Sequence, residues 1–379
     1  MVDLGSLAFV VSALTLPGEM FCFFLVVSLT VNLEFGYAGV PNFGKVLFIS
    51  LGAFVAGSFA YRLMVYLLNL KGDIFGLQNL FITEINNKLA ANPYLAVELF
   101  LFMIVVAAAM GGFFGFLASY PAIRLREDYL GMLLLAAGEF FLIFSQAYLP
   151  FLGGAEGVNA PAPVFYIGTI VGQPDLVVLG VLAAAAILIY VYSERVGRSP
   201  LGRTLRALRD NDVASEAVGK DVVALRRNVL IVSSAIAGIA GVMWISFQPL
   251  MTPGTTPEAT FNRLTDTFIP FVIVILGGAA NNRGVLLGTF VYLLIYNAFS
   301  QGVTALGPSV QNALSLVGID NLKLMLIGGL LIFILIRRPQ GLIPEKPTLT
   351  MSRAKLKEVA ESVIAKPQEK EQQQEKASS

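Results

Sequence analysis

Gly39, Gly44 and Lys45 have the spacing of a phosphate-binding loop, in which four residues separate a glycine from a Gly-Lys pair. Such a loop would bind nucleotide phosphates through its backbone amides and its lysine. A working loop also needs a serine or threonine after the lysine to hold magnesium, and Val46 stands there instead. Pro41 removes one amide donor. We therefore interpret this stretch as a Gly/Pro break between two apolar segments.

Other catalytic chemistry has few residues to use. The sequence contains no histidine, which removes the commonest general base and the commonest metal ligand. Its one cysteine, Cys22, lies within an apolar run and can form neither a disulfide framework nor a cysteine metal site. No nucleophile lies beside a base in an arrangement typical of covalent catalysis. We expect no catalytic residue, no metal site and no cofactor in this chain.

Ionisable and polar residues inside apolar segments are the remaining candidates. Glu139 falls near the middle of one segment, and Asn32 and Glu34 fall at the inner end of another, close to the break that contains Asn42. In hydrocarbon an unpaired carboxylate is costly, so Glu139 should pair, bind a proton or face water. We predict that these four residues line a translocation pathway or its gate. Glu139 could instead fix helix packing, and Glu34 could reach the aqueous interface.

The composition places these residues in a membrane protein. The chain has 379 residues, of which 56% are hydrophobic and 13% charged, and its mean hydropathy is +0.74. Soluble domains have about 25% charged residues, and one soluble core could not hide so much apolar surface. The net charge of +1 gives no indication of nucleic-acid binding. We expect an all-α, polytopic integral membrane protein.

Apolar runs separated by polar breaks predict about nine transmembrane helices, within a range of about 8–10. The seventh is short enough to be re-entrant. The small residues of "AIAGIAG", at 235–241, predict close helix packing in the sixth. The expected spans lie near residues 8–30, 44–62, 97–119, 129–149, 176–192, 229–248, 265–278, 284–300 and 322–337.

The distribution of basic residues predicts the orientation. The loop 193–228 carries eight of them, and the arginines that follow the third and the last spans fall on the same side. By the positive-inside rule this side is cytoplasmic. The N-terminus is then outside, the C-terminus is cytoplasmic, and the loop 63–96 is external. Residues 1–343 would form the transmembrane domain, and residues 344–379 a polar cytoplasmic tail that is largely disordered because it has too little apolar surface to fold.

The loop 193–228 is too long for a simple turn. Ser199 followed by Pro200 is typical of a helix start, and the leucines that follow recur on one helical face. A second short helix is expected over 213–218. An apolar ridge of this kind could fit a groove on a partner, whereas a basic helix could lie on anionic lipid headgroups. The candidate contact residues of this loop are Leu201, Leu205, Arg206, Leu208, Arg209, Asn211, Glu216 and Gly219.

Six stretches follow one another along the chain: "NLEFGYAGVPNFGK", "IRLREDYLGMLLLAAGEF", "GGAEGV", "SPLGRTLRALRDNDVASEAVGK", "VILGGAANNRGVLLG" and "RRPQGLI". Together they cover most of residues 30–343. In this order they resemble the signatures of branched-chain amino-acid permeases of ATP-binding-cassette (ABC) importers, in particular the LivM-type subunit.

The resemblance implies an all-helical permease subunit in the cytoplasmic membrane. Its implied partners are a second, LivH-like permease, two ATPase subunits that hydrolyse the ATP, and an extracytoplasmic substrate-binding protein. The implied substrate is a branched-chain or other hydrophobic amino acid, moved by alternating access. The loop 193–228 would couple the chain to the ATPases. Gly153, Gly154 and Gly157, otherwise an ordinary turn, would form an outer gate or contact the binding protein.

Two alternatives remain open. The solute could instead be urea or another small polar molecule, carried by the same class of importer. In a different class, the chain would be an ATP-independent secondary carrier or a channel. Such a carrier needs buried titratable groups for ion coupling, and the spans offer few besides Glu139. It also leaves the long basic loop without a role.

Overall fold

The computed structural model describes residues 4–125, 127–148, 151, 153–252, 254, 259–305 and 319–345. The chain divides into a unit of Met1–Pro344, which contains the helices of the bundle, and a second unit of Glu345–Ser379. The predicted disorder of the tail falls almost entirely outside the described residues.

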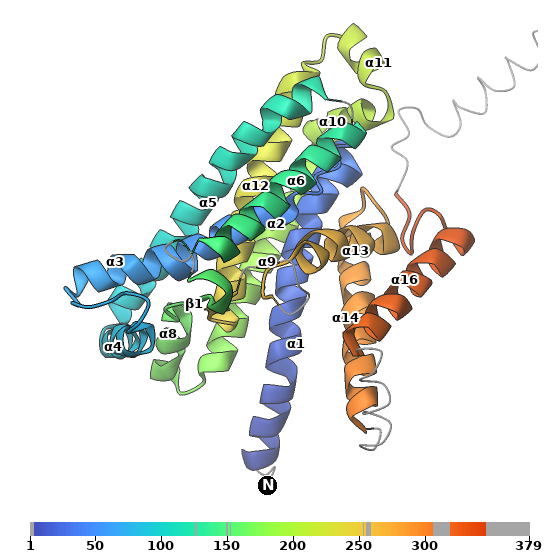
Figure 1. Ribbon diagram of the computed structural model, residues 1–379. Coiled ribbons are helices and arrows are strands. Elements are labelled where there is room, and N and C mark those ends of the chain that lie inside the picture. The colour runs from blue at the N-terminus through green and yellow to red at the C-terminus, as the bar shows by residue number, and fades with distance from the viewer. Residues whose placement is uncertain are drawn as a thin grey trace, which may run out of the picture. The chain divides into compact units, whose positions relative to one another are not determined.

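Helices make up nearly all of the regular structure (Figure 1). In chain order the elements are α1 (Leu4–Val31), η1 (Asn32–Tyr37), α2 (Lys45–Phe54), η2 (Val55–Phe59), α3 (Ala60–Leu67), α4 (Gln78–Ala91), α5 (Pro93–Arg124), α6 (Glu127–Ala147), η3 (Gly154–Glu156), β1 (Val158–Asn159), α8 (Pro163–Val171), α9 (Pro174–Arg198), α10 (Pro200–Asp210), α11 (Asp212–Ala217), α12 (Val222–Phe247), β2 (Leu250–Met251), η4 (Leu264–Phe268), α13 (Ile269–Gly277), α14 (Asn282–Ala305) and α16 (Ile319–Arg337). The segments η1, η2 and η4 are π-helical turns, and η3 is a 3₁₀ turn.

Within the described residues, six helices are long and apolar enough to cross a membrane. A seventh span is formed if the pair Leu264–Gly277 and Asn282–Phe299, which is bent by 116°, is counted as one. The predicted seventh and eighth spans are this bent pair, and the predicted ninth corresponds to the shorter apolar stretch Leu324–Arg337. The structure therefore supports a polytopic helical protein with six or seven spans and does not confirm nine. The six are Thr15–Tyr37, Lys45–Leu67, Pro93–Pro121, Tyr129–Ala147, Pro174–Arg198 and Val222–Phe247.

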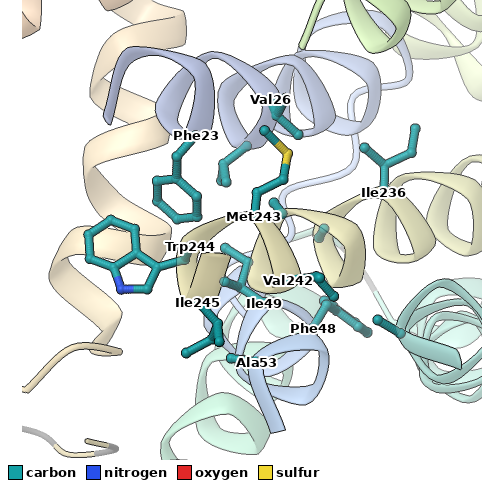
Figure 2. Packing of buried hydrophobic residues seen from close by; sticks show 14 of the residues in the cluster. Phe23, Val26, Phe48, Ile49, Ala53, Ile236, Val242, Met243, Trp244 and Ile245 are labelled. Atoms are coloured by element: carbon teal, nitrogen blue, oxygen red, sulfur yellow. The ribbon is translucent and has the colours of Figure 1, made fainter. Parts of the chain in front are cut away.

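Helix α12 lies at the centre of the packing, in contact with α1, α2 and α5. Figure 2 shows its Met243 and Trp244 among apolar side chains of α1 and α2. The rings of Trp244 and Phe23 meet edge to face, with centroids 4.6 Å apart. This cluster is the main core of the transmembrane unit.

The small residues of α12 allow its backbone to approach two neighbours closely. A Cβ atom added to Gly52 of α2 would lie 1.9 Å from the carbonyl oxygen of Gly238, so only glycine fits there. On another face of α12, a Cβ on Gly111 of α5 would lie 2.4 Å from the carbonyl oxygen of Ser234. The close packing predicted for 235–241 is confirmed.

The outer faces of several helices are apolar. Large side chains such as Leu101 of α5, Phe140 of α6 and Leu188 of α9 are more than half exposed. Apolar faces of this extent are stable only against lipid or another protein chain.

The short helices gather at two ends of the bundle. The pair α10–α11 joins the end of α9 to the start of α12, whereas α4, α8 and β1 lie toward the other end (Figure 1). There, β1 pairs antiparallel with β2, with Val158 opposite Met251.

Candidate functional site

The break between α1 and α2 contains a buried ion pair. The Glu34 carboxylate, in the π-turn η1, lies 2.9 Å from the Lys45 ammonium at the start of α2, and the two side chains are 1% and 0% exposed. The carboxylate also accepts hydrogen bonds from Asn42 Nδ2, at 3.2 Å, and from the Ser233 hydroxyl of α12. Glu34 therefore does not reach the aqueous interface. Its charge is balanced inside the protein instead, as a buried charge requires.

The residues that have the spacing of a phosphate loop are bonded within the chain instead. The lysine that would bind phosphate is held by Glu34. Backbone amides that would surround a phosphate are also engaged, because Val40 donates to the Glu34 carbonyl, Gly44 to Asn42 Oδ1, and Val46 to Thr267 Oγ1 at 3.0 Å. This geometry agrees with the interpretation of residues 39–46 as a break between spans.

Asn32 connects the end of the first span to two other elements. Its amide nitrogen donates to Asn282 Oδ1 at 2.9 Å, and its oxygen accepts from the Ala280 amide at 2.8 Å. Asn282 in turn donates to Glu194 of α9 at 3.1 Å. Gly36 faces this site, since a Cβ there would lie 2.1 Å from Asn32 Oδ1. The chain of amides thus joins η1, the bend between α13 and α14, and the end of α9.

Helix α10 contacts the other side of the π-turn. Arg209 donates to the Gly36 carbonyl at 2.6 Å, and its side chain packs beside Gly39, which has a φ of 71°. The Arg206 guanidinium lies over the Tyr37 ring, 5.0 Å from its centroid. Because a π-turn leaves its backbone imperfectly paired, the Gly36 carbonyl is available to an external donor.

The predicted helices of the loop 193–228 are confirmed. The Ser199 hydroxyl accepts from the Gly202 amide and begins α10, and Asn211 caps α11 by accepting from the Ala214 amide at 2.9 Å. Gly219, with a φ of 78°, follows the end of α11, as predicted.

The role predicted for the leucine ridge of α10 is corrected by the structure. Leu205 and Leu208 are buried within this chain, where α10 packs against α9 and η1, so they cannot fit a groove on a partner. Leu201 is exposed instead, and so is Glu216. Within the loop 193–228, the most exposed large apolar side chains lie on and beside α11, where Val213 is 72% and Val218 is 75% exposed. Helical periodicity identifies an apolar face but does not indicate whether the same chain or a partner protein covers it.

Glu139 pairs with Arg263, which directly precedes η4, at 3.2 Å. Of the outcomes expected for a carboxylate in a span, pairing is the one observed. The following residues of η4 reach the first site, because Thr267 accepts from the Val46 amide, next to Lys45. The stretch 263–268 therefore takes part in the Glu139 pair and also contacts Val46, which adjoins Lys45.

The three glycines of the loop before β1 have positive φ angles, of 74°, 65° and 76° for Gly153, Gly154 and Gly157. A Cβ on Gly157 would lie 2.1 Å from the Met251 carbonyl oxygen of β2, so backbone packing requires glycine there. Among the described residues, no hydrogen bond or ion pair joins these glycines to the Glu34 site.

The structure therefore brings together Asn32, Glu34 and Asn42 and joins them to Arg206 and Arg209. Sequence reasoning missed their partners Lys45, Ser233 and Asn282. It also missed Thr267, which accepts from the Val46 amide, and Arg263, which pairs with Glu139. Lys45 could have been identified, because a lysine at the start of an apolar span indicates a buried charge that needs a partner. In the described part of the chain, no group of three or more His, Cys, Asp and Glu residues could hold a metal ion.

Comparison with known proteins identifies the class. Residues 19–335 match the family model described as "Branched-chain amino acid transport system / permease component", and the chain belongs to this family.

Among individual relatives, the chain is 35% identical over 335 residues to the "Probable branched-chain amino acid transport permease protein LivM" of Methanocaldococcus jannaschii, covering 87% of this chain and 93% of that protein. It is 26% identical over 276 residues to the "High-affinity branched-chain amino acid transport system permease protein LivM" of Escherichia coli, covering 66% of this chain and 58% of the relative. No solved structure matches.

Proposed function

We propose that this chain is a permease subunit of an ABC importer that moves branched-chain or other hydrophobic amino acids across the cytoplasmic membrane. The observation that carries this proposal is family membership over residues 19–335, which include all six helices that could span a membrane apart from the first few residues of the first. The proposed partners are a second permease, two ATPase subunits and an extracytoplasmic binding protein. ATP hydrolysis takes place on the ATPases.

The end of the molecule that carries α10 and α11 is the proposed ATPase-docking surface, and it faces the cytoplasm. Its basic residues agree with this orientation. The exposed residues Val213, Glu216 and Val218 on and beside α11, with Leu201 of α10, supply the contact. The buried leucines of α10 fix the helix to its own chain. A displacement of α11 is then transmitted through α10 to the transmembrane helices.

The π-turn η1 is the proposed transmission point. Arg209 and Arg206 of α10 contact its residues Gly36 and Tyr37. Its own residues Asn32 and Glu34 bind to α2, α12 and the α13–α14 bend. Movement of α10 therefore displaces a segment that is bonded to several other elements. Such networks have discrete arrangements rather than continuous ones, as alternating access requires.

The pathway residues remain part of this proposal. Glu139, paired with Arg263, and the loop of Gly153, Gly154 and Gly157 are the candidate outer gate. Arg263 directly precedes η4, and Gly157 packs against β2. In this arrangement the substrate passes between this chain and its permease partner, against the apolar faces described above.

Reconstitution tests the proposal. The chain is co-expressed with its neighbouring permease, ATPase and binding-protein genes, purified through a tag on this chain, and placed in proteoliposomes. We expect the ATPases and second permease to co-purify and leucine with its binding protein to stimulate both ATP hydrolysis and leucine uptake. Purification of this chain alone, or leucine uptake independent of ATP, would favour the carrier or channel.

A further inference from the structure

A cavity of about 490 Å³ lies among α1, α4, α8, α9 and α12, at the end away from α10 and α11. Its volume falls within the range of small-molecule sites. Aromatic and aliphatic side chains line most of it, including Phe165, Phe247 and Val178. A ligand with a branched aliphatic side chain fits such walls.

Two carboxylates, Glu19 and Asp175, also line this cavity, and its lining among the described residues includes no lysine or arginine. Glu19 is only 6% exposed. Among the described residues, no hydrogen bond or ion pair neutralises it, unlike Glu34 or Glu139. The nearby Asp175 carboxylate, in the first turn of α9, repels its charge further. A buried carboxylate with a like-charged neighbour and no internal partner is neutralised either by a proton or by a cation from outside.

The cavity also contains hydrogen-bond donors. Asn86 uses its oxygen to accept from the Ala162 amide, which leaves its amide NH₂ group for a ligand. Tyr166, whose hydroxyl is a further possible donor, also lines the cavity. Donors and anions therefore border one apolar space. This combination suits a zwitterion with an apolar side chain.

We infer that this cavity binds a hydrophobic amino acid, whose α-ammonium group is held by Glu19 and Asp175 and whose carboxylate meets Asn86 and Tyr166. The inference rests on the proposed function, since it gives the importer an entry site on the side opposite the ATPase-docking surface. A primary amine of a lipid headgroup has the same ammonium chemistry, and the experiment separates the two.

The test uses the assembled importer without its binding protein, in lipid nanodiscs. Dicyclohexylcarbodiimide modifies carboxyl groups in apolar surroundings, and mass spectrometry reports the fraction of Glu19 that has reacted. We expect leucine and isopentylamine to protect Glu19 about tenfold at about ten times their dissociation constants. The carboxylate analogue 4-methylpentanoate should not protect, and Glu139, which pairs with Arg263, serves as the internal reference.

Variants sharpen the test. Asp175→Asn should weaken protection by isopentylamine about tenfold, because a charge-assisted bond is lost. Glu84→Gln, which removes an exposed carboxylate from α4 at the same end, is the matched control and should change nothing. Equal protection by 4-methylpentanoate, or none by leucine, overturns the inference. Protection that appears only when phosphatidylethanolamine is added to phosphatidylcholine discs assigns the site to lipid and also overturns it.

Leucine uptake provides a second test if Glu19 does not react with the carbodiimide. Glu19→Gln should lower leucine uptake by proteoliposomes about tenfold while the importer still assembles, and Glu84→Gln should not. Normal leucine uptake by Glu19→Gln overturns this inference and leaves the proposed function intact. Failure of the unmodified importer to transport leucine contradicts the proposed function instead, and the labelling result still reports whether an ammonium ligand binds.

Discussion

Glu34 and Lys45 are each tolerable inside the protein only because the other is present. Their atoms lie 2.9 Å apart with essentially no exposure, and Asn42 and Ser233 satisfy the remaining carboxylate positions. A buried pair of this kind contributes little to net stability relative to apolar residues, but loss of one partner is severe. The pair is therefore better understood as a constraint on how η1 and α2 meet.

Removal of either charge should destabilise the protein by about 3–5 kcal/mol, because the remaining charge is left buried. We expect Glu34→Gln and Lys45→Met each to lower the melting temperature in mild detergent. The double variant should recover much of the loss. Strictly additive losses in this double-mutant cycle would contradict a direct interaction between the two side chains.

For individual residues, the sequence predicted which positions belong to the site better than it predicted which residues contact one another there. Asn32, Glu34 and Asn42 were predicted because polar residues in apolar runs are conspicuous. Lys45 was considered only as a phosphate ligand, since its pairing with Glu34 depends on the turn geometry of the break. Arg263 and Asn282 are far from their partners along the chain, and no local pattern brings them together.

Helix α12 depends on backbone contact with its neighbours. Gly52→Ala would place a methyl group against the Gly238 carbonyl, and separating α2 from α12 should cost about 1–3 kcal/mol or more. We expect a lower melting temperature and a lower yield of folded protein. Gly328→Ala in α16 is the matched control, because a Cβ there meets nothing within 4 Å. Equal tolerance of both changes would contradict the close packing.

The contact between α10 and η1 should govern coupling. Arg209→Ala removes the bond to the Gly36 carbonyl, and we expect leucine transported per ATP hydrolysed to fall at least about fivefold while hydrolysis continues. Paired uptake and phosphate-release assays measure this ratio. Arg203→Ala, at an exposed position of the same helix, should leave it unchanged. An equal fall in both variants would indicate a general loss of basic charge instead.

Element boundaries in the loop were predictable because they depend on local chemistry. Ser199, Pro200 and Asn211 specify helix starts through their own backbone and side-chain geometry. The direction in which Leu205 and Leu208 face is a tertiary property, which is why the predicted partner contact was wrong. The π-turns also escaped prediction, since they arise where packing and polar contacts override the regular α-helical spacing.

The orientation of the whole molecule remains a prediction that can be tested directly. With Cys22 replaced by serine, single cysteines are placed at the exposed positions of Glu84, in α4, and Glu216, in α11. We expect a membrane-impermeant maleimide to label the α4 position in intact cells and the α11 position only after permeabilisation. The reverse pattern would place α10 and α11 outside and remove the basis for ATPase docking.

Charge pairing between the first two spans also bears on how the chain is made. Glu34 lies in the segment that ends at η1, and Lys45 begins α2, so each of these two charges is neutralised by a residue of the other segment. Released singly into lipid, either segment would keep an unpaired charge, whose cost reaches about 2.5–3.5 kcal/mol at the bilayer centre on insertion scales and is smaller toward the span ends, where Glu34 and Lys45 lie. We expect the two to leave the translocon as a hairpin, which makes synthesis of the second segment the step that commits the first to the membrane.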